Sequence, residues 1–194
     1  MTKLAKFTSD ILNPFLSSFI IIVLLSMEST AGISETLKWA AISLVLSVIP
    51  ILCVVIGMVR MKKLDGLFVN PREQRTRIYL LATVLAVIGC IVLYILGAPQ
   101  LLLAVFISGL AAILSYMIIN LFWKISLHTA FVAASVTILV IVYRAAAAWT
   151  IVLLPLVAWA RVQLKMHTTA QVVSGALLAS VLVVIVFQLF GLVV

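Results

Sequence analysis

The chain has 194 residues, of which 66% are hydrophobic and 9% are charged, and its mean hydropathy is +1.39. No soluble core of this size needs such an excess of apolar residues, so the composition excludes a water-soluble globular protein. The formal charge of +8 does not indicate nucleic-acid binding, because the basic residues lie in short gaps between apolar runs and form no continuous basic domain.

Apolar runs follow one another along the chain, and many approach the roughly 20 residues that a transmembrane helix needs. The fifth and sixth runs are short and are joined only by Arg144 and an alanine run, so a tight hairpin or a single broken element is possible there. The fold class predicted is all-α, a polytopic transmembrane helical bundle with six or seven spans in a single integral membrane domain. The candidate spans lie at about 15–27, 37–59, 78–96, 101–122, 127–143, 146–159 and 172–194.

The first run follows Lys3 and Lys6, as the apolar part of a signal peptide would. More spans follow it rather than a soluble domain, so we expect it to be retained as the first span. Cys53 and Cys90 lie inside apolar runs without paired spacing, and we interpret both as packing residues rather than as disulfide or metal-binding cysteines.

The charges in the loops predict the orientation of the chain. In a seven-span arrangement only Lys38 and Arg144 fall on the side opposite the N-terminus. By the positive-inside tendency the other side, with the N-terminus, is cytoplasmic. The cations on that side are Lys3, Lys6, Arg60, Lys62, Lys63, Arg72, Arg75, Arg77, Lys124, Arg161 and Lys165.

Polar residues gather in three segments, at 65–75, 124–129 and 161–171. Two spans separate each segment from the next, so all three emerge on the same membrane face. Ionisable residues at the ends of spans are functional candidates, and we therefore expect one composite site on the cytoplasmic face.

The residue types in these segments favour phosphate chemistry. Arginines bind phosphoryl oxygens, one of the two histidines, His128 and His167, can act as the nucleophile, and the other can protonate the leaving oxygen. Ser126 can cap the following helix, whose free N–H groups favour an anion. His167 and Gln171 are four apart, which predicts a hydrogen bond across one helical face. Two histidines without a nearby carboxylate or cysteine are too few ligands for zinc.

These segments resemble the three-motif signature of the type 2 phosphatidic acid phosphatase superfamily of membrane lipid phosphatases, written KxxxxxxRP, PSGH and SRxxxxxHxxxD. The third motif is matched in spacing by Ala160 and Arg161, His167 and Gln171, and the second by the Ile-Ser-Leu-His run at 125–128. The resemblance covers residues 65–176, and the phosphatase-like core is expected at about 60–194.

The first motif is the most divergent. Arg72 keeps the motif arginine, while Asp65 stands where lysine is expected and Glu73 where proline is expected. Lys124 and Arg75 are candidate substitutes for that lysine.

The resemblance implies a mechanism in which His167 attacks phosphorus and forms a phosphohistidine. His128 would protonate the leaving oxygen and then activate water, and Arg72, Arg161 and Ser126 would hold the phosphoryl oxygens. It implies no metal and no cofactor.

Gln171 replaces the aspartate that fixes the histidine tautomer in this superfamily. An amide can accept the Nδ1–H bond but carries no charge, and a flipped amide would favour the wrong tautomer. Asp65 could supply the missing carboxylate if its loop folds over His167.

The resulting hypothesis is a metal-independent membrane lipid phosphatase that hydrolyses a lipid phosphate or an isoprenoid diphosphate, with the bilayer and its lipid as partners. One alternative is a lipid phosphotransferase of the same superfamily. Another is a catalytically weakened relative that binds anionic lipid. A transporter has little support, because the spans lack charges at their middles and show no inverted repeat. The sequence does not predict an oligomeric state.

Overall fold

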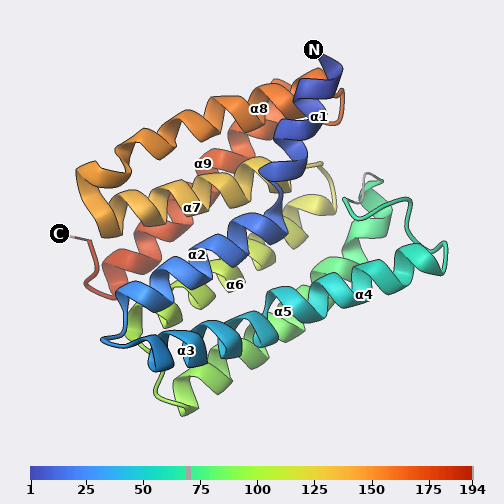
Figure 1. Cartoon of the computed structure of the whole chain (residues 1–194). Helices are drawn as coiled ribbons and strands as arrows, with labels where there is room; N and C mark the ends of the chain where they lie inside the picture. Colours follow the sequence, from blue (N-terminus) through green and yellow to red (C-terminus); the bar gives the residue numbers. More distant parts are fainter. Residues whose placement is uncertain (69–70, 194) are drawn as a thin grey trace. The chain divides into compact units, whose positions relative to one another are not determined.

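The computed structural model describes residues 1–68 and 71–193, except for the side chains of Arg72 and Glu73. These residues form helices and connections and no strand, and six helical stretches are long and apolar enough to cross a membrane (Figure 1). The predicted all-α transmembrane fold is confirmed, and it supports an integral, multi-pass membrane protein.

The helices of the described residues follow the runs predicted from the sequence, with an extra short helix at the N-terminus. They are α1 (Thr2–Ile11), α2 (Pro14–Glu28), α3 (Ile33–Leu46), α4 (Val48–Arg60), α5 (Arg72–Ile95), α6 (Gln100–Asn120), α7 (Leu127–Tyr143), the 3₁₀ helix η1 (Arg144–Val152), α8 (Leu153–Gln163) and α9 (Thr169–Leu189).

The chain divides into two compact units. We call Met1–Ile21 with Lys124–Val194 the terminal unit, and Ile22–Trp123 the central unit.

In the terminal unit, the stretch Leu127–Gln163 is a helical hairpin. The helix α7 ends at Tyr143. Its cap residue Arg144 has a φ of 55°, in the left-handed region, and η1 and α8 then run back along α7 (Figure 1). Val132 and Val136 of α7 form a buried cluster with Val157 of α8. Of the two possibilities that the sequence left open here, the hairpin is the one observed. It returns the chain to the end of the unit where α7 begins.

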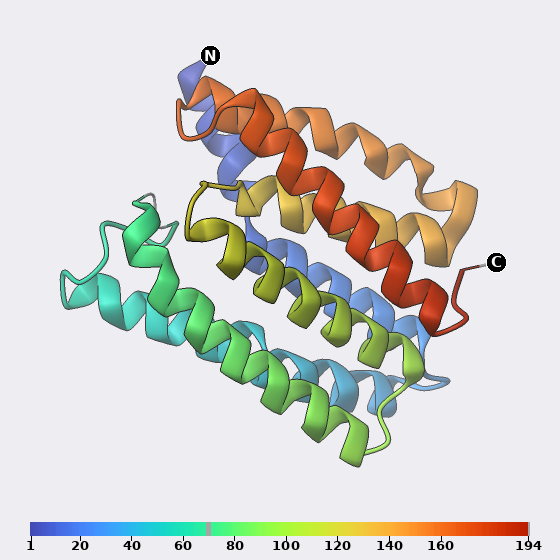
Figure 2. The same ribbon diagram turned by 180° about the vertical axis from the view of Figure 1, so that it is seen from behind.

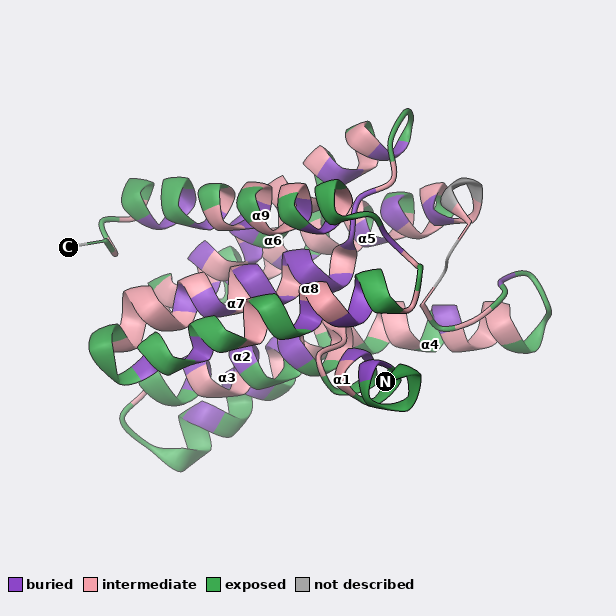
Figure 3. Ribbon diagram, turned by 90° about the horizontal axis from the view of Figure 1, so that it is seen from above, coloured by how far each residue is buried: buried purple, intermediate pink, exposed green. Residues whose placement is uncertain are grey.

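The helix α9 packs along α7 in the same unit (Figure 2). Thr137 donates a hydrogen bond from Oγ1 to Ser180 Oγ at 2.9 Å. A Cβ on Gly175 would lie 2.8 Å from the Ser126 carbonyl oxygen, so the glycine permits this close approach. Exposed apolar residues cover the outer face of α9, while its buried residues form a stripe (Figure 3). Such a surface suits a lipid solvent.

In the central unit, α3 and α4 form one apolar stretch that is interrupted at Ser47. Pro50 has no N–H to donate to the carbonyl one turn back, which explains the break. The helices α5 and α6 pack where Gly89 faces the Phe106 ring, and Asn120 donates from Nδ2 to Thr76 Oγ1 at 3.4 Å.

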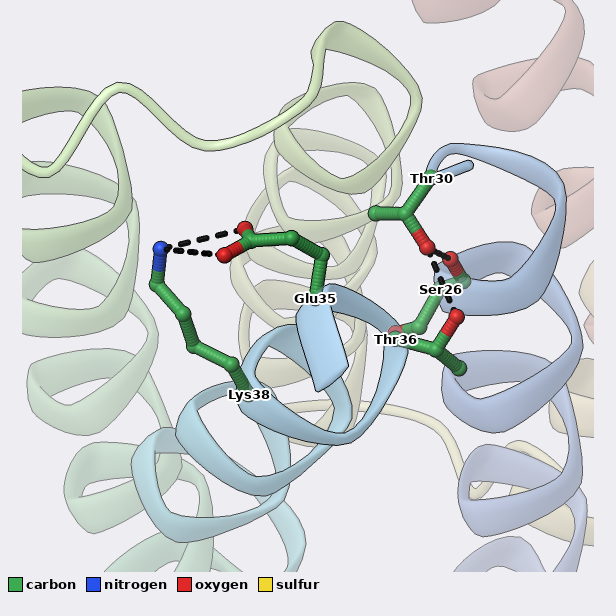
Figure 4. A network of polar contacts seen from close by, with 5 residues as sticks. All are labelled: Ser26, Thr30, Glu35, Thr36 and Lys38. Atoms are coloured by element: carbon green, nitrogen blue, oxygen red, sulfur yellow. Dashed lines mark hydrogen bonds and ion pairs between the residues drawn. The ribbon is translucent and has the colours of Figure 1, made fainter. Parts of the chain in front are cut away.

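Hydroxyl groups stabilise the connection between α2 and α3. Thr30 Oγ1 donates to the Ser26 carbonyl at 2.9 Å and lies 2.7 Å from Thr36 Oγ1 (Figure 4). Nearby, Lys38 forms an ion pair with Glu35 at 3.1 Å. Both side chains of this pair are about half exposed, so the pair adds little to stability.

Candidate functional site

The end of α8 turns the chain back over Arg161. Lys165 has a φ of 54° and donates its N–H to the Val162 carbonyl, while Met166 donates to the Arg161 carbonyl at 3.2 Å. These two bonds are those of a Schellman cap, in which a left-handed residue ends the helix. The His167 N–H also reaches the Arg161 carbonyl, at 3.4 Å. The cap therefore brings His167 back beside Arg161.

The start of α9 is closed by a capping box. Gln171 donates its N–H to Thr168 Oγ1 at 3.3 Å, and Thr168 donates its N–H to Gln171 Oε1 at 3.2 Å. A Thr-x-x-Gln pattern before an apolar run is typical of this arrangement. Gln171 is thus held by the local fold of the chain.

Gln171 also binds the first candidate histidine. His167 Nδ1 lies 3.1 Å from Gln171 Oε1, so the predicted hydrogen bond is present. The predicted geometry was wrong, because His167 precedes the cap residue Thr168 and shares no helical face with Gln171. The bond arises from the capping box instead.

The capping box determines the tautomer of His167. The Thr168 backbone N–H can only donate, so the Gln171 atom that faces it is the amide oxygen. An amide oxygen only accepts, and His167 Nδ1 must therefore be the donor. In the neutral ring the proton is then on Nδ1, and Nε2 carries the lone pair.

The segment before α7 packs directly against this turn. Ser126 donates its N–H to the Gln171 carbonyl at 3.4 Å, and Lys124 donates from Nζ to the Met166 carbonyl at 2.8 Å. Ser126 caps α7, as predicted, because its Oγ accepts from the Thr129 N–H at 3.5 Å. The second and third predicted segments therefore lie side by side.

Three side chains with phosphate chemistry are buried in the terminal unit. Arg161, His128 and His167 are 3%, 4% and 7% exposed, and Ser126 is fully buried. The unit carries six lysines and arginines and one acidic residue, Asp10, so its field favours anions. Around a capped helix start, a buried cationic group can bind the oxygens of a phosphoryl group. Buried imidazole groups can transfer protons in its reaction.

The first predicted segment belongs to the central unit. Asp65 is exposed there and accepts from Gln74 Nε2 at 3.4 Å through Oδ2. Arg75 is buried beside Tyr79, one turn along α5. The side chain of Arg72 lies outside the described residues. The roles predicted for Asp65, Arg72 and Arg75 stay predictions.

Among the residues that the structure describes, no three His, Cys, Asp or Glu side chains form a cluster that could hold a metal ion.

Ser9 of α1 accepts a hydrogen bond at 2.8 Å from Arg161 Nη1, a contact that sequence reasoning missed. The pattern of Ala5 and Ser9, small residues four apart in an amphipathic segment, is the signal that could have pointed to it.

Compared with known proteins, the chain matches no protein-family model, no curated protein and no solved structure.

Proposed function

We propose that this protein is a membrane phosphatase that hydrolyses a lipid phosphate or an isoprenoid diphosphate through a phosphohistidine at His167. The terminal unit contains five of the residues that the proposed reaction uses, namely His167, His128, Arg161, Ser126 and Gln171. Lys124, bonded to the Met166 carbonyl, supports the turn that carries His167.

The observation that carries the proposal is the hydrogen bond between His167 Nδ1 and Gln171 Oε1. A histidine attacks phosphorus with an unprotonated nitrogen, and the capping box leaves Nε2 as that nitrogen. The superfamily resemblance gives an aspartate the same task. Gln171 supports the required tautomer but lacks the negative charge of an aspartate.

In the proposed reaction, the Nε2 lone pair forms a bond to phosphorus while the bond from phosphorus to the lipid oxygen breaks. His128 gives a proton to that oxygen, and the lipid alcohol or lipid phosphate departs. Water then attacks the phosphohistidine, His128 takes a proton from it, and Nε2 is released with inorganic phosphate. Arg161 and the Ser126 hydroxyl would donate to the phosphoryl oxygens in both steps.

The membrane position of the site follows the loop charges. The loops at the end of the terminal unit that carries His167 contain Lys124 and Lys165, whereas the hairpin turn at the other end contains Arg144. Together with the basic N-terminus, this favours a site on the cytoplasmic face. A phosphate group at the lipid headgroup level could reach it there.

A second candidate function is lipid binding without turnover. The capping box explains Gln171 as a structural residue, and the buried basic groups suit an anionic headgroup without any reaction. A lipid phosphotransferase differs from the main proposal only in the acceptor of the phosphoryl group, an alcohol in place of water.

The proposal is tested by phosphate release from the purified protein in detergent. The panel contains farnesyl diphosphate, undecaprenyl diphosphate, phosphatidic acid and phosphatidylglycerophosphate, with a chelator present throughout. His167→Asn is the reaction control, because asparagine keeps a polar side chain of smaller size. We expect release that persists in chelator and is lost in His167→Asn.

The alternatives give different results in the same assay. Release that begins only when a lipid alcohol is added, with the phosphate appearing on that alcohol, would indicate a phosphotransferase. Equal and negligible release by both proteins, with binding of the same lipids retained, would exclude the hydrolysis proposed and favour lipid binding.

A further inference from the structure

The N-terminal helix α1 has one face of large, exposed apolar residues and another face of small, buried residues. Leu4, Phe7 and Ile11 recur at helical spacing and are 60%, 63% and 45% exposed. On another face Ala5 and Ser9 are 0% and 2% exposed, and α1 packs there against α8 (Figure 1). Small residues permit close approach of two helices.

The third face of α1 is polar and exposed, with Lys3, Lys6 and Asp10. A helix with basic residues on one face and large apolar residues on the next is typical of the membrane interface. The helix ends at Ile11, with Leu12 as its cap residue, and α2 begins at Pro14.

The small-residue face of α1 reaches the buried guanidinium of Arg161. Arg161 Nη1 donates to Ser9 Oγ at 2.8 Å, and the two residues are 3% and 2% exposed. A guanidinium has five N–H donors in one plane, so fixing one of them restricts the directions of the others. The Arg161 carbonyl is meanwhile held by the N–H groups of Met166 and His167. The backbone and the side-chain end of Arg161 thus have separate supports.

We propose that Ser9 is a positioning residue for phosphate binding, through which the N-terminal helix orients the Arg161 guanidinium. This inference rests on the proposed function in one respect only, that Arg161 binds the phosphoryl oxygens. Ser9 lies 152 residues before Arg161 in the sequence. The proposed site therefore includes a helix outside the segment that resembles the phosphatase superfamily.

The test measures anion binding and turnover in Ser9→Ala, with Ser9→Thr as the variant that retains the hydroxyl. Ser108→Ala is the matched control, because Ser108 is also buried, at 4%, and its hydroxyl binds a carbonyl of its own helix. The probe is inorganic phosphate, whose half-saturating concentration is read from the rise in thermal unfolding temperature. The KM and kcat for the best lipid phosphate are measured beside it.

We expect Ser9→Ala to raise the half-saturating phosphate concentration and the KM about tenfold, the size of one hydrogen bond to a charged group. The kcat should change less than the KM, and Ser9→Thr and Ser108→Ala should bind phosphate like the wild type. An unchanged phosphate affinity in Ser9→Ala would overturn the inference. Equal losses in Ser9→Ala and Ser108→Ala would overturn it as well, since they indicate general destabilisation.

Failure of the proposed function gives a distinct result. If the protein binds phosphate in a Ser9-dependent way but releases none from any lipid, the positioning role holds and hydrolysis does not. If inorganic phosphate does not bind to the wild type at all, Arg161 is no phosphate ligand and the inference falls.

Discussion

The amide of Gln171 performs two tasks with one oxygen atom. It accepts the Thr168 N–H that would otherwise be unsatisfied at the start of α9, and it accepts the Nδ1–H of His167. Replacing the carboxylate of a catalytic triad by an amide lowers turnover about 10⁴-fold, because the wrong tautomer is favoured. The backbone N–H of Thr168 prevents that amide orientation here, so in the proposed reaction the only disadvantage of Gln171 relative to an aspartate would be the missing negative charge.

Substitutions of Gln171 separate the tautomer from the charge. Gln171→Glu keeps the capping box and adds the charge that stabilises a cationic imidazole, so we expect phosphate release to be equal or faster. Gln171→Met removes the acceptor, and we expect release to fall about 10²-fold or more. Rates are measured at saturating lipid substrate. Equal rates in Gln171→Met and the wild type would show that the hydrogen bond to His167 does not contribute.

At the scale of the helices, the site depends on how closely α9 approaches the start of α7. Gly175 lies one turn beyond Gln171, and its missing side chain lets the Ser126 carbonyl lie at contact distance. This approach accompanies the hydrogen bond from the Ser126 N–H to the Gln171 carbonyl. A shift of α9 would therefore move the cap that holds His167.

Gly175→Ala tests this contact between helices. The added Cβ would lie 2.8 Å from the Ser126 carbonyl oxygen, so we expect destabilisation of about 1–3 kcal/mol and reduced phosphate release. Gly109→Ala is the control, because nothing lies within 4 Å of the Cβ added there. Thermal unfolding in detergent measures both variants. If the two variants unfold at the same temperature, the approach of α9 to Ser126 is looser than described.

The sequence predicted the helical stretches well because long apolar runs have few alternatives in a membrane. It also predicted the Ser126 cap and the pairing of His167 with Gln171, since both depend on local spacing. It could not predict the capping box geometry, which depends on where α9 begins. The sequence could not predict the contact between Ser9 and Arg161, because no local sequence pattern relates residues that are so distant in the chain.

At the scale of the whole chain, the structure supports a multi-pass membrane protein, and the orientation stays a prediction. The hairpin of α7 with η1 and α8 places the turn at Arg144 and the turn at Lys165 at opposite ends of α8 and η1 in the terminal unit. Labelling of the two turns can therefore identify the membrane face of the site.

Single cysteines at two exposed positions measure this orientation. Ala146→Cys and Gln163→Cys are introduced after Cys53 and Cys90 are changed to serine, and intact cells are treated with a membrane-impermeant maleimide. We expect the cysteine at 146 to be labelled from outside and that at 163 only after the cells are opened. The reverse pattern would place the site on the outer face.

The most direct test of the central claim is to trap the phosphorylated enzyme. The protein is mixed with excess radiolabelled lipid phosphate, quenched in alkali after a fraction of a turnover, and digested for mass spectrometry. We predict an acid-labile, base-stable phosphate on the peptide that contains His167, absent from His167→Asn. Steady phosphate release with no label on His167, or with the label on another residue, would contradict the account.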